Sequence, residues 1–174
     1  MPFLENVGIT SVWKNYNIAG AFLAKEDEDS YKWAIEQLVK MFGKVQRAPT
    51  CVVTDREKAL MNALEKQFPE AKFILCRRHV RKNIEDFGKK AMDKFRGTTF
   101  SNDCMKLFKE TTIQGYEASL SKLKCDWRKA PKCLQYLQQN WLDPYKERIV
   151  SIWTDTVFTL GTTTTNRFVH QQFI

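Results

Sequence analysis

The sequence lacks the features that place a protein in a membrane or in an oxidising compartment. None of its apolar runs reaches the roughly 18 residues that a membrane-spanning helix needs. The first residues, MPFLENVGIT, are neither basic nor hydrophobic enough for a targeting segment. The cysteines are odd in number, and no two are spaced as Cys-x-x-Cys; they are Cys51, Cys76, Cys104, Cys125 and Cys133. We therefore expect a reduced intracellular compartment and no contact with a membrane.

The chain also lacks internal repeats and low-complexity linkers, and its 174 residues suit one domain. Hydrophobic residues make up 43% of the sequence and aromatic residues 13%, which is enough for a packed core. The formal net charge of +8 favours an acidic partner, of which nucleic acid is the commonest. A soluble basic protein without such a partner has the same composition, so charge alone does not decide.

The first half of the chain alternates strand-like and helix-like segments. Short β-branched or apolar runs predict strands at residues 4–12, 17–24, 50–54 and 72–76. Apolar spacings of three and four predict helices at residues 31–43, closed by Gly43, at 59–68, ended by Pro69, and at 78–95, which is strongly basic. This order predicts the α/β class.

The second half has only helical spacings between Ser101 and Arg148, with expected breaks at Gly115, Pro131 and Pro144. Trp127 continues an apolar stripe, which favours the core over a binding surface for this side chain. A threonine-rich loop is expected at residues 162–165.

Asp55 is the first candidate for chemistry, because it follows a predicted strand directly. Functional groups of open α/β sheets gather at the carboxyl ends of strands. A carboxylate there can hold a divalent metal, although phosphoryl transfer at two metals needs several carboxylates around ions roughly 4 Å apart. The alternative is a helix cap, since Thr54 and Glu57 have the spacing of a capping box. From these residues alone the cap is the simpler interpretation.

Cys76 and His79 have the spacing Cys-x-x-His where a strand meets a helix. Thiolate and imidazole are both good zinc ligands, but a structural zinc site needs four ligands and the sequence shows no second paired motif. The alternative is a buried cysteine that ends the strand and a solvent-facing histidine among arginines. Spacing alone favours this alternative.

The helix after His79 is a candidate surface for a phosphate backbone. Its candidate DNA-binding residues are Arg77, Arg78, Arg81, Lys82, Lys89 and Lys90. A second basic cluster surrounds Trp127 and consists of Lys122, Lys124, Arg128, Lys129 and Lys132. Aromatic residues interleaved with cations suit single-stranded or distorted DNA. Solvated helix faces without a ligand are the alternative for both clusters.

Together these segments resemble the transposase domain of Mutator-like elements (MULE). The resemblance lies in MPFLENVGITS, NIAGAFLAKEDEDSYKWAIEQL, VVTDREKALMNAL and FPEAKFILCRRHVRKNI. The later GTTTTNR resembles the stretch that leads to the final acidic residue of that family. The resemblance covers nearly the whole chain, and TDREKALMNA joined to LCRRHVRKN at this distance is a fairly specific combination.

The resemblance implies a ribonuclease-H-like core at residues 1–100, an all-helical insertion at 101–160 and a remnant of the final core segment at 161–174. It also implies a DDE mechanism, in which three acidic residues hold two Mg²⁺ or Mn²⁺ ions that promote phosphodiester cleavage and strand transfer. Asp55 matches the second acid, while Cys76 and His79 match the Cys-x-x-His pair of the family. DNA as partner and a nuclear location follow from the same resemblance.

Two departures from the family pattern predict that the chain is an inactive fragment. The first catalytic Asp and the central strand are expected just upstream of MPFLENVG, so the fold is expected to be incomplete. After Asn166 and Arg167 the family places an apolar residue and then Glu, where this chain has Phe168 and Val169. A domesticated DNA-binding or transcription-regulatory module is the alternative, as in plant transcription factors derived from this family. An active enzyme with wrongly assigned ends is a third. The sequence does not predict the oligomeric state.

Overall fold

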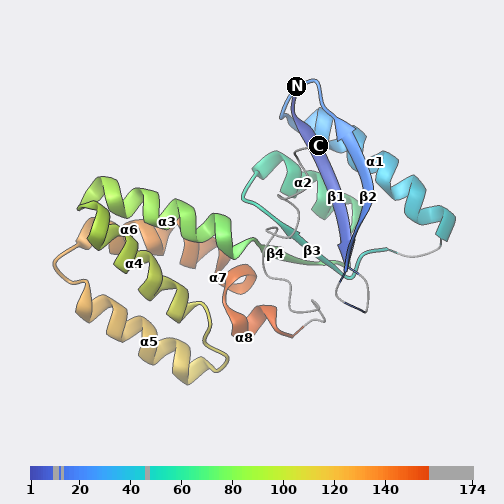
Figure 1. Cartoon of the computed structure of the whole chain (residues 1–174). Coiled ribbons are helices and arrows are strands. Elements are labelled where there is room, and N and C mark those ends of the chain that lie inside the picture. The colour runs from blue at the N-terminus through green and yellow to red at the C-terminus, as the bar shows by residue number, and fades with distance from the viewer. Residues whose placement is uncertain (10–11, 13, 46–47, 157–174) are drawn as a thin grey trace. The chain divides into compact units, whose positions relative to one another are not determined.

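A computed structural model describes residues 1–9, 12, 14–45 and 48–156 of the chain. The described residues contain helices together with two small sheets, which confirms the α/β class (Figure 1). They divide into two compact units. The first is Met1–Phe73, and the second is Ile74–Phe158, of which residues 74–156 are described.

The strands predicted at residues 4–12 and 17–24 are present and form a hairpin. Strands β1 (Phe3–Ile9) and β2 (Asn15–Phe22) pair antiparallel, in a register that runs from Phe3 opposite Phe22 to Ile9 opposite Asn15. An irregularity between Asn6 and Val7 shifts the register by one residue. The backbone N–H of Leu23 donates to the carbonyl oxygen of Pro2 at 2.8 Å and continues the pairing beyond the strands.

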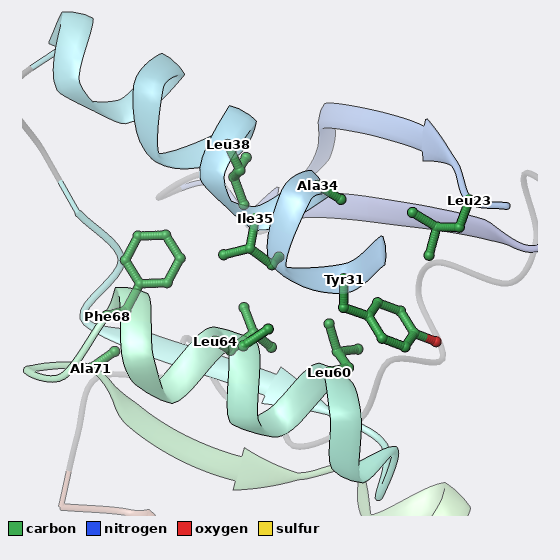
Figure 2. Packing of buried hydrophobic residues seen from close by; sticks show 10 residues of the cluster. Leu23, Tyr31, Ala34, Ile35, Leu38, Leu60, Leu64, Phe68 and Ala71 are labelled. Carbon is green, nitrogen blue, oxygen red and sulfur yellow. The ribbon is translucent and has the colours of Figure 1, made fainter. Parts of the chain in front are cut away.

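Helices α1 (Glu28–Val45) and α2 (Lys58–Gln67) form the core of the first unit. Figure 2 shows their apolar faces turned toward each other. The buried core side chains are those of Leu23, Tyr31, Ala34, Ile35, Leu38, Leu60, Ala63, Leu64, Phe68 and Ala71. This set confirms the helical stripes predicted from spacing, because residues three and four apart share one helix face.

The predicted end of α1 at Gly43 was wrong, since the helix continues to Val45. A glycine ends a helix when its backbone turns to positive φ, and Gly43 has no such φ. Pro69 does act as expected, because α2 ends at Gln67 and Phe68 is its C-cap.

Strands β3 (Cys51–Thr54) and β4 (Lys72–Leu75) form the second sheet. Both were predicted from short apolar runs. Among the described residues, no strand joins this sheet to the β1–β2 hairpin. The described strands therefore form two separate two-stranded sheets rather than one continuous sheet.

The second unit begins with helices α3 (Arg77–Ala91) and α4 (Lys94–Leu107). The prediction of one helix as far as Phe95 was wrong. Asp93 supplies the physical reason, because its side chain accepts the backbone N–H of Arg96 at 2.8 Å and caps a new helix. At Met92 the backbone leaves helical geometry, with φ of −127° and ψ of −98°.

Two glycines allow α3 and α4 to pack backbone against backbone. A Cβ atom on Gly88 would lie 3.0 Å from the Cα of Gly97. A Cβ atom on Gly97 would lie 2.3 Å from the backbone nitrogen of Lys89 and 2.7 Å from the carbonyl carbon of Gly88. Such distances exclude any side chain at position 97, so the helices could not approach as closely with another residue there.

The helical character predicted for residues 101–148 is confirmed, and the predicted break at Pro131 falls where α6 (Pro131–Leu137) begins. The break predicted at Gly115 was wrong, because Gly115 lies in the first turn of α5 (Ile113–Asp126) and donates its backbone N–H to the N-cap Thr112 at 3.0 Å. The break predicted at Pro144 was wrong. The chain continues from α6 through the π-helix η1 (Gln138–Leu142) into α7 (Asp143–Ile149), and α8 (Ser151–Thr154) follows. The backbone N–H of Asp143 donates to the carbonyl oxygen of Gln138, five residues earlier, which makes a wider turn than that of an α-helix. This wider turn accommodates Pro144, which has no backbone N–H to donate.

Large side chains from several helices fill the second unit, including Trp141, Phe100 and Phe108. Trp127 is also buried, packs edge-to-face on Phe100 at 5.1 Å between ring centroids, and donates from Nε1 to Asp103 Oδ2 at 3.1 Å. This confirms its assignment to the core. Burial raises the pKa of the Cys104 thiol, which therefore stays protonated and acts as a core side chain.

The domain boundaries predicted at residues 100 and 160 stay a prediction, because a compact unit need not coincide with an insertion. The final segment, residues 161–174, lies outside the described residues, together with the predicted loop at 162–165. No helix in the described part of the chain has the length and apolar character needed to cross a membrane.

Replacing Gly97 by alanine should destabilise the second unit by about 1–3 kcal/mol, because the added methyl group forces α3 and α4 apart. Thermal unfolding followed by circular dichroism measures the effect. The control is Gly43→Ala, which also lies in a helix but has open space around the new Cβ. It should be neutral or slightly stabilising. Equal melting temperatures for the two variants would contradict the close packing.

Candidate functional site

Asp55 lies where β3 ends, and its side chain is exposed. Its Oδ1 accepts the backbone N–H of Glu57 at 3.3 Å. The capping box predicted from Thr54 and Glu57 was wrong, because the N-cap of α2 lies at Glu57, three residues after Thr54. Glu57 is itself the N-cap and accepts the N–H of Ala59 at 3.3 Å, while Thr54 is a buried strand residue. Asp55 is therefore held at the strand end without being the cap of α2.

The carboxylates of Asp55, Glu57 and Glu26 act together on the hydroxyl of Tyr31. The pKa of Tyr31 is raised to about 12, first by burial of its hydroxyl and then by the charges of Glu26, Glu57 and Asp55. Spacing in the sequence did not reveal that Tyr31 and Glu26 belong to this region, because they come from the segment around the start of α1.

The described residues do not form a complete metal site. No group of three His, Cys, Asp or Glu side chains among them is placed to hold a metal ion. Asp55 supplies a single carboxylate, whereas a two-metal centre needs several. Phe168 and Val169 stand where the family has an apolar residue and then its final acid, and both lie outside the described residues.

Cys76 and His79 lie within the first turn of α3, where Cys76 is the buried N-cap. The expectation of a solvent-facing histidine was wrong, because His79 is half-buried. Its Nδ1 is buried and has no hydrogen-bond partner in the described part of the chain. Coordination of a metal ion would satisfy that nitrogen. Cys76 and His79 are, however, only two of the four ligands that a structural zinc site requires. Zinc at this position stays a prediction.

Arg77 differs from the other predicted DNA contacts because its guanidinium is bound within the second unit. Its Nε donates to the carbonyl oxygen of Ile149 at 2.8 Å. One Nη donates to Ser151 Oγ at 2.8 Å and to Thr154 Oγ1 at 3.2 Å. Burial lowers the pKa of Arg77, and the charge of Asp155 partly offsets this effect. Arg77 therefore joins the start of α3 to α7 and α8.

The remaining predicted contacts on α3 are exposed to different degrees. Arg78, Lys82 and Lys90 are exposed, and Arg81 donates to Asn102 Oδ1 at 2.8 Å. Lys89 is half-buried and pairs with Glu85 at 2.6 Å, which neutralises its charge locally. Hydrogen bonds from Lys89 and from Thr98 lower the pKa of Glu85. The cationic surface of α3 consequently rests mainly on Arg78, Arg81, Lys82 and Lys90.

The second basic cluster lies at the end of α5 and in the turn into α6. Lys124, Arg128, Lys129 and Lys132 are exposed, whereas Lys122 pairs with Asp126 at 3.4 Å. The guanidinium of Arg96, at the start of α4, lies 5.9 Å from the centroid of the Trp127 ring. This contact brings the start of α4 to the same basic turn.

The first 83 residues match the family model of the MULE transposase domain. The match spans the first unit and the first residues of α3, including Asp55, Cys76 and His79. Residues 1–83 are therefore similar to the MULE transposase domain family, which confirms the resemblance seen in the sequence for this part of the chain.

Protein FAR-RED IMPAIRED RESPONSE 1 of Arabidopsis thaliana is similar to nearly the whole chain. The identity is 22% over 173 residues, which cover 96% of this chain and 19% of that protein. The chain thus spans about a fifth of the length of this curated relative. No solved structure matches the chain.

Replacing Arg77 by methionine should lower the free energy of unfolding by about 1.5–3 kcal/mol, because hydrogen bonds from a charged donor to three oxygen acceptors are lost. Chemical unfolding followed by circular dichroism measures the loss. Arg78→Met removes the same charge from the exposed neighbouring position and should leave stability nearly unchanged. Two equally stable variants would show that the Arg77 contacts do not hold the unit together.

Proposed function

We propose that this chain is a MULE-transposase-related module that binds DNA. The observation that carries the proposal is the exposed cationic face of α3, formed by Arg78, Arg81, Lys82 and Lys90. The net charge of +8 acts in the same direction. Lysine and arginine side chains that replace the counterions of a phosphate backbone provide sequence-independent affinity for DNA.

The helical geometry of α3 supports this role. The side chains of Val80, Ile84 and Gly88 are buried along one stripe, so the basic residues lie away from that stripe. Asp86 is an exposed acid on the same helix, four positions from both Lys82 and Lys90. The four exposed cations outnumber it, which leaves positive charge for phosphate contacts. A DNA-binding role also agrees with the nuclear location that we infer from the family.

Replacing both Lys82 and Lys90 by glutamine should weaken DNA binding and reduce its salt dependence. Each lost phosphate contact lowers the slope of log affinity against log salt by about 0.9, so the double variant should lose roughly 1.8. Fluorescence anisotropy with a labelled duplex at several salt concentrations gives the slope.

The matched control replaces Lys66 and Lys106 by glutamine. It removes the same charge, but these lysines pair with Glu28 and Asp103, each at 2.8 Å. The slope of this control should stay close to that of the parent chain. Equal slopes for the two double variants would show that binding depends on net charge alone, and would contradict the proposal that α3 contacts the DNA.

We also propose that the first unit is part of a ribonuclease-H-like fold. The support is the order hairpin, helix, strand, helix, strand, and the division of the strands into β1–β2 and β3–β4. In the fold that the family resemblance implies, a further central strand would unite these pairs. An experimental structure of the full-length protein tests this, because all four strands should then belong to a single sheet.

A second candidate function is metal-dependent cleavage of phosphodiester bonds with Asp55 as one metal ligand. The supporting observation is the exposed carboxylate of Asp55 at the end of β3, which acts on the Tyr31 hydroxyl together with the carboxylates of Glu26 and Glu57. The described residues lack the further carboxylates of a two-metal centre, so we derive no catalytic step from them.

The test of this second candidate is cleavage of labelled DNA by the full-length protein with Mn²⁺ or Mg²⁺. If Asp55 is a ligand, Asp55→Asn should abolish cleavage, while Asp29→Asn, an exposed acid in the first turn of α1, should retain it. DNA binding measured on the same samples separates a lost ligand from a misfolded protein. The absence of cleavage from the unsubstituted protein would leave DNA binding as the function.

The regulatory form of the DNA-binding proposal draws support from the relative in Arabidopsis. That protein is named for a far-red response and not for transposition. A domesticated module keeps the cationic helices and has no need of the catalytic acids. Under this proposal, DNA binding survives the replacement of Asp55.

A further inference from the structure

Phe95 is the most exposed aromatic side chain in the described part of the chain, with 81% of its surface accessible. It belongs to the first turn of α4, between Lys94 and Arg96. An aromatic ring so far from any packing partner contributes little to the stability of the unit. Both sequence neighbours are exposed cations.

Several elements bring further cations to this end of the second unit. The contact of Arg96 with the Trp127 ring, at 5.9 Å, places the start of α4 beside the turn between α5 and α6. Figure 1 shows the end of α3 and the start of α4 at the same end of the unit as that turn. The exposed cations here are Lys90, Lys94, Arg96, Lys124, Arg128, Lys129 and Lys132. We call these residues, together with Phe95, the basic end.

The acidic residues of the basic end are already engaged. Asp93 accepts the backbone N–H of Arg96 as the cap of α4. Asp126 pairs with Lys122 at 3.4 Å. The exposed cations of the basic end outnumber these two acids, so it carries an excess of positive charge, and an anionic polymer is the ligand that fits it.

We infer that the basic end binds an unpaired nucleic-acid strand, with the Phe95 ring stacked on a base and the surrounding cations along the phosphates. Proteins that bind single strands combine these two features, because every base presents a face for stacking and every nucleotide carries a negative charge. A duplex hides its base faces, so only the cations would contact it. The inference rests on the proposed DNA binding and adds a preference for strand state.

Trp127 was the aromatic residue that the sequence placed among cations, but it is buried and packs on Phe100. Phe95 takes the role that Trp127 cannot, because its ring is on the surface. The turn at Met92 and Asp93 is the reason, since it makes Phe95 a first-turn residue of α4 instead of the last residue of α3.

The experiment measures binding of the full chain to a labelled oligo-dT strand and to a labelled duplex of equal length by fluorescence anisotropy. Phe95→Ala should weaken single-strand binding roughly tenfold, the effect of losing one stacked base, and leave duplex binding unchanged. Phe95→Trp should restore or strengthen it. Ile113→Ala is the matched control, because Ile113 is also an exposed apolar residue in the first turn of a helix, with 57% of its surface accessible.

Three outcomes separate the two proposals. A selective loss with Phe95→Ala and its rescue by tryptophan support the inference. Salt-dependent duplex binding together with no difference between Phe95→Ala and Ile113→Ala overturns the inference and leaves the proposed function standing. If the parent chain binds neither nucleic acid, both proposals are wrong.

Discussion

The close approach of Gly88 and Gly97 determines the form of the helical unit. With no side chain on either residue, the backbones of α3 and α4 pack directly against each other. Asp93 ends the reversal between the helices by capping α4. Because the helices are antiparallel neighbours, the lysines at the end of α3 and the cations at the start of α4 lie at one end of the unit. The cationic surface therefore depends on a contact that involves no charge at all.

Hydrogen bonds and ion pairs within the chain determine which cationic side chains remain available to a ligand. The guanidinium of Arg77 is bound by oxygen atoms of α7 and α8, and Lys89 is bound by Glu85. Arg78, Lys82 and Lys90 are exposed on the same helix. Positive charge in a sequence is thus a poor measure of an interface, because desolvation and ion pairing remove part of it.

Much of the secondary structure could be predicted from the sequence, and the failures have specific physical causes. Strands were found where β-branched and apolar runs are short, and α1 and α2 where apolar residues recur at three and four. One helix was predicted across Asp93 as far as Phe95, although the Asp93 side chain is able to cap a new helix. Pro144 was read as a break, although a π turn accommodates it within the helix. Prediction from local sequence therefore failed at residues that can take either of two local structures.

The sequence by itself determined the α/β class and the similarity of residues 1–83 to the MULE transposase domain. It also determined the place of Asp55 after a strand and of Cys76 and His79 around a strand-to-helix junction. These depend on periodicity and on motifs between neighbours along the chain. Only the tertiary structure decided that Trp127 is buried and Phe95 exposed, and that Arg77 serves the fold. Burial and pairing depend on residues distant in sequence, since Arg77 meets its acceptors 72 to 77 positions later. No local pattern encodes such contacts.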